Sequence, residues 1–153
     1  MPELRRAQLR RGLKVCIKLD SALTRKVVAE LSSGGRKEAV FYKVFKVEDG
    51  RRLLPLFQNY ADYASESGGD GWMRASEKAK EFRDEGYSGA GTYHAYMSAE
   101  EAEGVRAWIE DVYPNVVVRE VTVPLESIVG CCGISGAVAF KRMRVRFLQG
   151  EGL

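Results

Sequence analysis

The chain has 153 residues, of which 45% are hydrophobic and 29% are charged, and its formal net charge is +3. These values are typical of one globular domain and exclude a low-complexity chain. No apolar run approaches the ~20 residues of a membrane-spanning helix. The N-terminus, "MPELRRAQLRRGLK", lacks the apolar segment of a signal peptide. We therefore expect a cytoplasmic protein without membrane contact.

The charges are distributed unevenly along the chain. Residues 1–19 carry six bases and one acid, residues 60–112 carry five bases and twelve acids, and residues 139–153 carry four bases and one acid. We expect a basic, flexible segment over 1–12 and a single domain over 13–153. If the two ends meet, they form one basic face that suits phosphates or an acidic protein. The alternative is a solvated tail and an edge strand.

Four elements are expected in the first third of the chain. Alternation predicts a strand over 13–19, and a helix follows over 21–33 with Asp20 or Ser21 as its cap. β-branched and aromatic residues predict a strand over 38–47. A turn at "EDG" (48–50) leads to a returning strand over 51–57, in which Pro55 marks an edge or an end.

The remainder predicts loops at 60–71 and 86–91, and a helix over 72–85 with apolar residues at helical spacing. A strand over 92–97 runs into a helix whose capping box is Ser98 with Glu101 and which stops by Pro114. Strands follow over 115–125 and 137–147, separated by a glycine-punctuated loop or irregular edge. The pattern predicts an α+β fold: a twisted, largely antiparallel sheet with about three helices.

The last predicted strand carries an arginine stripe. Period-two alternation puts Arg142, Arg144 and Arg146 on one face, roughly 6.5–7 Å apart. Guanidinium groups bind phosphate or carboxylate through paired hydrogen bonds. The alternative is a solvent-exposed strand face with cross-strand glutamate partners, such as Glu120.

The glycine-rich loops match no phosphate-binding motif. They are interpreted as mobile connections or as a lid over a pocket. Aromatic residues in or beside them either stack on a ligand ring or anchor the loops to the domain. The aromatic residues concerned are Tyr60, Tyr63, Trp72 and Tyr87.

His94 is the only histidine in the chain. Alternation places Tyr93 and Met97 on the helix-covered side of the sheet, and His94 with Tyr96 on the opposite side. Because no nucleophile or orienting acid accompanies it in the sequence, we expect a structural or ligand-contacting role rather than a catalytic one.

Cys16, Cys131 and Cys132 are expected to be reduced, small apolar residues. One histidine and no CxxC pair make a zinc site improbable. We expect neither a metal nor a cofactor.

The segment Tyr42 to Val145 is similar to small bacteriophage and prophage proteins of uncharacterised function. The likeness rests on Gly91, His94 and Tyr96, on an early "EA" in the following helix, and on a "VTV" strand that ends at Pro124. It implies a phage origin, with the host cytosol as the location, and assigns no role to any residue.

A looser likeness is to the ADP-ribosyltransferase fold, in which a strand with an aromatic-serine end precedes a helix, as "HAYMS" does here. It implies His94, Tyr96 and Glu126 as catalytic candidates. Pro124 stands where that fold has a second acidic or glutamine residue.

The main functional hypothesis is a non-catalytic phage accessory protein that binds an anionic, nucleotide-like ligand or a host protein, and so inhibits a host defence. Its ligand contacts would be Arg142, Arg144, Arg146, His94, Tyr96, Tyr87 and Trp72. The alternatives are a nucleotide-dependent transferase and, last, a nucleic-acid-binding protein that uses the basic N-terminus.

Overall fold

A computed structural model describes residues 17–55, 66–67, 71–75, 87–88, 92–133 and 135–152. The basic segment 1–12 lies outside these residues, as do Cys16, Tyr60 and Tyr63. Most of the helix expected over 72–85 lies outside them too.

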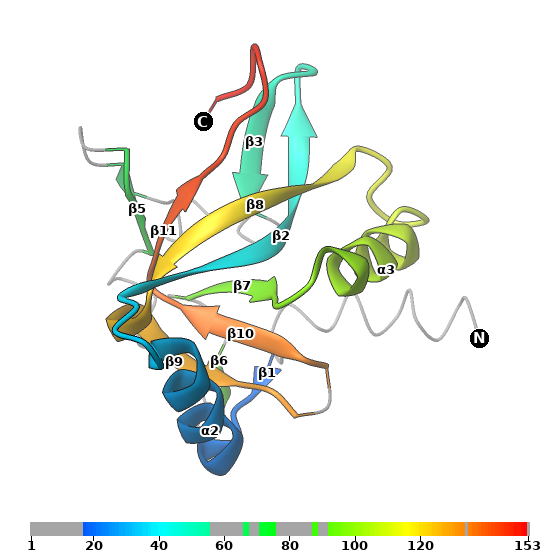
Figure 1. The fold of residues 1–153 in the computed structure, drawn as a ribbon. Coiled ribbons are helices and arrows are strands. Elements are labelled where there is room, and N and C mark those ends of the chain that lie inside the picture. Colours follow the sequence, from blue (N-terminus) through cyan, green and yellow to red (C-terminus); the bar gives the residue numbers. More distant parts are fainter. Residues whose placement is uncertain are drawn as a thin grey trace.

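Two α-helices occur in the described part of the chain: α2 (Ser21–Ser32) and α3 (Ala99–Ile109). A short 3-10 helix, η3, spans Leu125–Ser127. The strands are β1 (Ile17–Lys18), β2 (Glu38–Glu48), β3 (Arg52–Pro55), β4 (Glu66–Ser67), β5 (Met73–Arg74), β6 (Tyr87–Ser88), β7 (Tyr93–Tyr96), β8 (Val116–Pro124), β9 (Ile128–Cys131), β10 (Ala137–Phe140) and β11 (Arg142–Val145). Figure 1 labels most of them.

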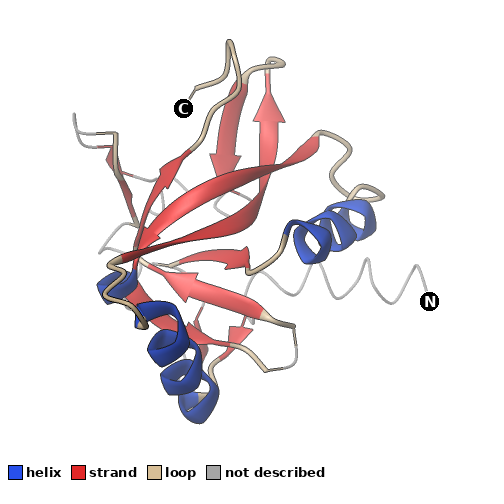
Figure 2. Cartoon of the chain, in the orientation of Figure 1, coloured by secondary structure: helices blue, strands red, loops and turns tan. Residues whose placement is uncertain are grey.

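One sheet dominates the described residues, as Figure 2 shows. Its strand order is β4-β5-β11-β8-β2-β7-β10-β9, with β3 also paired to β2, and every pair of neighbouring strands is antiparallel. β1 and β6 form a separate two-stranded sheet. The predicted α+β fold with a largely antiparallel sheet is confirmed. No described helix has the length and apolar character to cross a membrane.

The two faces of the large sheet differ in what covers them. One face carries the larger core cluster, which includes Phe41, Phe45 and Tyr93, and α2 packs there through Val27. Val44 lies on the other face and packs against Ile109 of α3. β2 and β8 are long and curved (Figure 1), and strands from both halves of the chain contribute residues to the larger core.

Both helices begin at caps that the sequence indicated. Asp20 Oδ1 accepts a hydrogen bond from the Leu23 N–H at 3.0 Å. In the capping box, Ser98 Oγ accepts from the Glu101 N–H at 3.1 Å and bonds the Glu101 carboxylate at 3.1 Å. Asp49 and Gly50 of the β2–β3 connection both have positive φ, as the central residues of a type I′ turn do, and the strands pair from Glu48 and Arg52 onward.

The prediction of one strand over 137–147 is wrong, because the structure has two strands there, β10 and β11. β10 ends at Phe140, and β11 begins at Arg142 with different neighbours. Lys141 lies at the break: its N–H donates to Ser127 O at 3.0 Å, and its carbonyl accepts from the Ala75 N–H at 2.9 Å. At Lys141 the pairing of β10 with β7 and β9 ends, and the pairing of β11 with β8 and β5 begins.

The helix expected over 72–85 does not begin at Trp72, because Met73 and Arg74 form β5 against β11. Met73 is buried opposite Met143, so core burial in a strand outweighs the helical spacing. Two segments expected as loops contain the short strands β4 and β6, and the segment expected as a loop or irregular edge contains β9, which is at the edge of the large sheet.

The C-terminal segment pairs with the chain at the start of β3. Gly152 exchanges backbone hydrogen bonds with Leu53 and Arg51. The Glu151 carboxylate accepts two hydrogen bonds from the Arg119 guanidinium, at 2.8 and 2.6 Å. This pairing lowers the pKa of Glu151 and raises that of Arg119.

Candidate binding site

The arginines of the stripe, in β11 and just after it, lie on the sheet face away from the larger core. Met143 and Val145, which alternate with them, are buried, whereas Arg144 and Arg146 are exposed. Arg142 pairs with Arg74 of β5, and Arg144 pairs with Thr122 of β8. We call this region the Trp72–Arg144 surface; it comprises Trp72, Arg74, Thr122, Arg142, Arg144 and Arg146.

The three arginines of the stripe differ in what they contact. Arg142 forms an ion pair with Glu126, and Arg146 forms one with Glu120 at 3.1 Å. The predicted cross-strand role of Glu120 is thus confirmed for Arg146. Arg144 instead places its guanidinium carbon 4.4 Å from the centroid of the Trp72 ring. No carboxylate among the described residues forms an ion pair with Arg144.

Stacking on Trp72 leaves the hydrogen-bond donors at the edge of the Arg144 guanidinium available. A guanidinium that stacks through its face keeps the N–H groups at its edge, and these are the donors that bind phosphate or carboxylate. Gly71, with a φ of 84°, brings the chain into Trp72 close to the arginine: a Cβ at Gly71 would lie 3.9 Å from Arg144 Nε. The sequence marked Trp72 and Arg144 separately, and the structure brings them together.

His94 and Tyr96 lie on the same sheet face as the arginine stripe, by the strand register. Tyr42 pairs with Tyr96 on one side and with Glu120 on the other, and Glu120 is the partner of Arg146. His94, however, lies three strands and four residues away from Arg144, which corresponds to roughly 20 Å. The structure therefore does not combine His94 and Arg144 into one site.

His94 lies on the face that α3 covers, contrary to the prediction that it lies opposite that helix. It is two residues from Tyr96 and so shares a face with Tyr42 and Val44, and Val44 packs against α3. The prediction was wrong because the strand and the helix that follows it were assumed to meet through Tyr93. Tyr93 instead packs in the larger core with α2.

Burial and a nearby cation keep His94 neutral. Its Nε2 is 3.1 Å from the Thr92 hydroxyl, and Thr92 is itself buried. Burial, followed by the charge of Lys43, lowers the pKa of His94 to about 3. The imidazole is therefore uncharged at neutral pH, which suits a structural role.

Lys43 is the residue that the sequence interpretation missed. Only 3% of it is exposed, and its Nζ donates a hydrogen bond to the His94 carbonyl at 2.9 Å. The same ammonium lies 5.7 Å from the Phe45 ring centroid and 5.8 Å from that of Tyr93. The available signal was its position in "FYKVF", where alternation places Lys43 on the apolar face with Phe41 and Phe45.

The three catalytic candidates, His94, Tyr96 and Glu126, contact different partners and do not form one site. Glu126 lies in η3, with its carboxylate paired to Arg142, and it forms no hydrogen bond with His94 or Tyr96. Tyr96 packs with a small cluster that includes Cys132 and Ala137. Tyr87 lies in β6 of the two-stranded sheet, away from the strands that carry the arginines.

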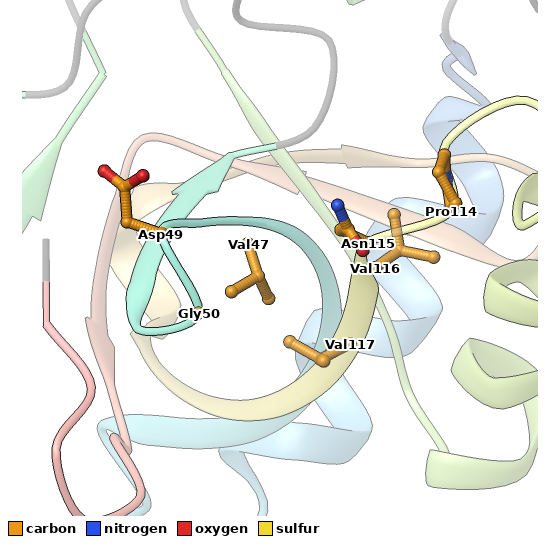
Figure 3. A pocket seen from close by; sticks show the side chains of 7 residues that line it. All are labelled: Val47, Asp49, Gly50, Pro114, Asn115, Val116 and Val117. Carbon is orange, nitrogen blue, oxygen red and sulfur yellow. The ribbon is translucent and has the colours of Figure 1, made fainter.

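A separate hollow of about 330 Å³ lies at the other end of β2 and β8. Val47 and Val117 lie in its middle, flanked by Asp49 and Asn115 (Figure 3). Its lining has one carboxylate and no basic side chain. This charge disfavours an anion, so the hollow is not an extension of the Trp72–Arg144 surface.

Cys131 and Cys132 are free and buried, as expected. Burial raises the pKa of the Cys131 thiol, which lowers its reactivity. No group of three histidine, cysteine or acidic residues that could hold a metal occurs in the described part of the chain.

Comparison with protein-family models, with curated proteins and with solved structures found no match to this chain. The resemblances to bacteriophage proteins and to the ADP-ribosyltransferase fold therefore stay predictions.

Proposed function

We propose that this protein is a non-catalytic binding protein that holds an anionic ligand or an acidic partner protein at the Trp72–Arg144 surface. The observation that supports it most directly is the contrast among the three arginines of the stripe. Arg142 and Arg146 are each neutralised by a glutamate, while Arg144 stacks on Trp72.

The chemistry follows from the arrangement of charges. The edge of the Arg144 guanidinium can donate two parallel hydrogen bonds to a phosphate or a carboxylate. Arg142 is paired with Glu126 and Arg146 with Glu120, so the charge of Arg144 is the one in the stripe that no carboxylate of the described residues balances. This excess of positive charge attracts an anion and speeds its encounter with the surface.

The setting we propose comes from the resemblance to bacteriophage proteins. An accessory protein of a phage would use such a surface to sequester an anionic nucleotide signal of a host defence, or to dock on a host protein. Neither role requires a catalytic group at the surface.

The proposal is tested by measuring the binding of two anion classes, a panel of linear and cyclic nucleotides and poly-L-glutamate, by calorimetry. Arg144→Ala should weaken the binding of whichever anion binds by about tenfold, as expected for a lost charge-assisted pair. Arg36→Ala is the matched control, because Arg36 is also exposed and lies outside this surface. Equal binding by the wild type and Arg144→Ala would contradict the proposal.

A further inference from the structure

The Trp72–Arg144 surface continues across the sheet to an exposed apolar side chain. Thr122 of β8 pairs with Arg144 on one side and with Val40 of β2 on the other. Val40 is 49% exposed, which is unusual for a valine in the middle strands of a sheet. The cationic group and the apolar group therefore lie in one row, two strand spacings or about 10 Å apart.

The composition of this row is that of a protein-binding surface. Tryptophan, tyrosine and arginine are the residues that contribute most to protein–protein binding. Here Trp72 and Arg144 lie at one end of the row, and Tyr42 neighbours Val40 on the same sheet face. The hollow around Val47 and Val117 lies elsewhere and does not belong to this row.

We infer that the occupant of this surface is an acidic protein segment that also carries an apolar side chain. A carboxylate of the segment pairs with Arg144, and an aliphatic or aromatic side chain covers Val40. The 10 Å between the two positions corresponds to about three residues of extended chain. This inference rests on the proposed function and narrows it, because it selects a protein partner over a free nucleotide.

The test uses a fluorescent peptide that repeats Leu-Glu-Glu-Glu, in which each leucine has a glutamate three residues away, and a second peptide in which glutamine replaces every glutamate. Fluorescence anisotropy is measured with the wild-type protein and two variants. Val40→Glu places a carboxylate where the apolar contact is expected, and it should weaken binding of the acidic peptide by about tenfold. Met97→Glu is the control, because Met97 is similarly exposed, at 41%, and follows β7 outside this row.

The outcomes separate this inference from the proposed function. The inference is supported if the acidic peptide binds, the glutamine peptide does not, and only Val40→Glu weakens binding. If nucleotides bind through Arg144 while the acidic peptide does not bind, the inference is wrong and the proposed function stands. If the peptide binds equally to the wild type and Val40→Glu, the apolar half of the inference is wrong. If Arg144→Ala changes the binding of neither anion class, both are wrong.

Discussion

Among single residues, the buried Lys43 ammonium has the most unusual environment. A lysine loses solvation when it is buried and needs compensating contacts. The His94 carbonyl and the rings of Phe45 and Tyr93 supply three of them. Its hydrogen bond joins residues 51 positions apart. Alternation places Lys43 on the core face, but the sequence gives no indication of this partner.

The neutral state of His94 predicts a pH-dependent stability. The unfolded state takes up a proton near the ordinary pKa of 6.5, whereas the folded state resists it down to about 3. Stability is therefore full above 6.5 and is lost progressively as the pH falls towards 3. Between about pH 7 and about pH 5, His94 should account for a loss of about 2 kcal/mol in the free energy of unfolding.

Urea denaturation of the wild type and His94→Gln at both pH values measures this loss. The variant should lose less stability on acidification, because glutamine does not titrate. Lys43→Met is a second comparison: without the nearby charge the pKa of His94 should rise, but burial, the larger cause, still keeps it low, so the loss between these pH values should stay close to that of the wild type. Equal losses in the wild type and His94→Gln would show that His94 is not protected from protonation.

Other side chains of the candidate site were partly predictable. The period of two gave the arginine face, and Glu120 was anticipated as a cross-strand partner. Which arginine lacks a carboxylate depends on where η3 places Glu126 and on the pairing of β5 with β11. Both are tertiary features that residue spacing does not encode.

Among the elements, α3 is the one whose start was predicted most sharply. Ser98→Ala removes the hydroxyl that accepts from the Glu101 N–H and should cost about 1 kcal/mol of stability. Glu101→Gln is the control, because glutamine also completes a capping box. Thermal unfolding checks both variants. A melting temperature for Ser98→Ala equal to that of the wild type would contradict the role of the cap.

The predicted element boundaries were wrong where one chain segment changes its neighbouring strands. The alternation over 137–147 continues through Lys141, yet the pairing passes from β7 and β9 to β8 and β5. A pattern of alternating residues reports which face is buried and is silent on the neighbouring strand. The same reason explains β5, where Met73 is buried by pairing with β11 rather than by a helix.

For the whole molecule, the curved sheet separates two surfaces of different charge. The Trp72–Arg144 surface lies over β5, β11 and β8, and the hollow around Val47 and Asp49 lies at the other end of β2 and β8. The C-terminal segment pairs beside β3 and supplies Glu151 to the partly buried Arg119–Glu151 ion pair. The basic C-terminal stretch expected from the sequence thus contributes both an anion-binding candidate and a structural ion pair.

The central claim is that Arg144, held on Trp72, is an anion-binding position. The most direct measurement is the fluorescence of Trp72 in a Trp108→Phe variant, in which Trp72 is the only tryptophan. Titration with poly-L-glutamate and with nucleotides should change its emission saturably, and high salt or Arg144→Ala should abolish the change. Emission that no anion alters, or a change that persists in Arg144→Ala, would contradict the claim.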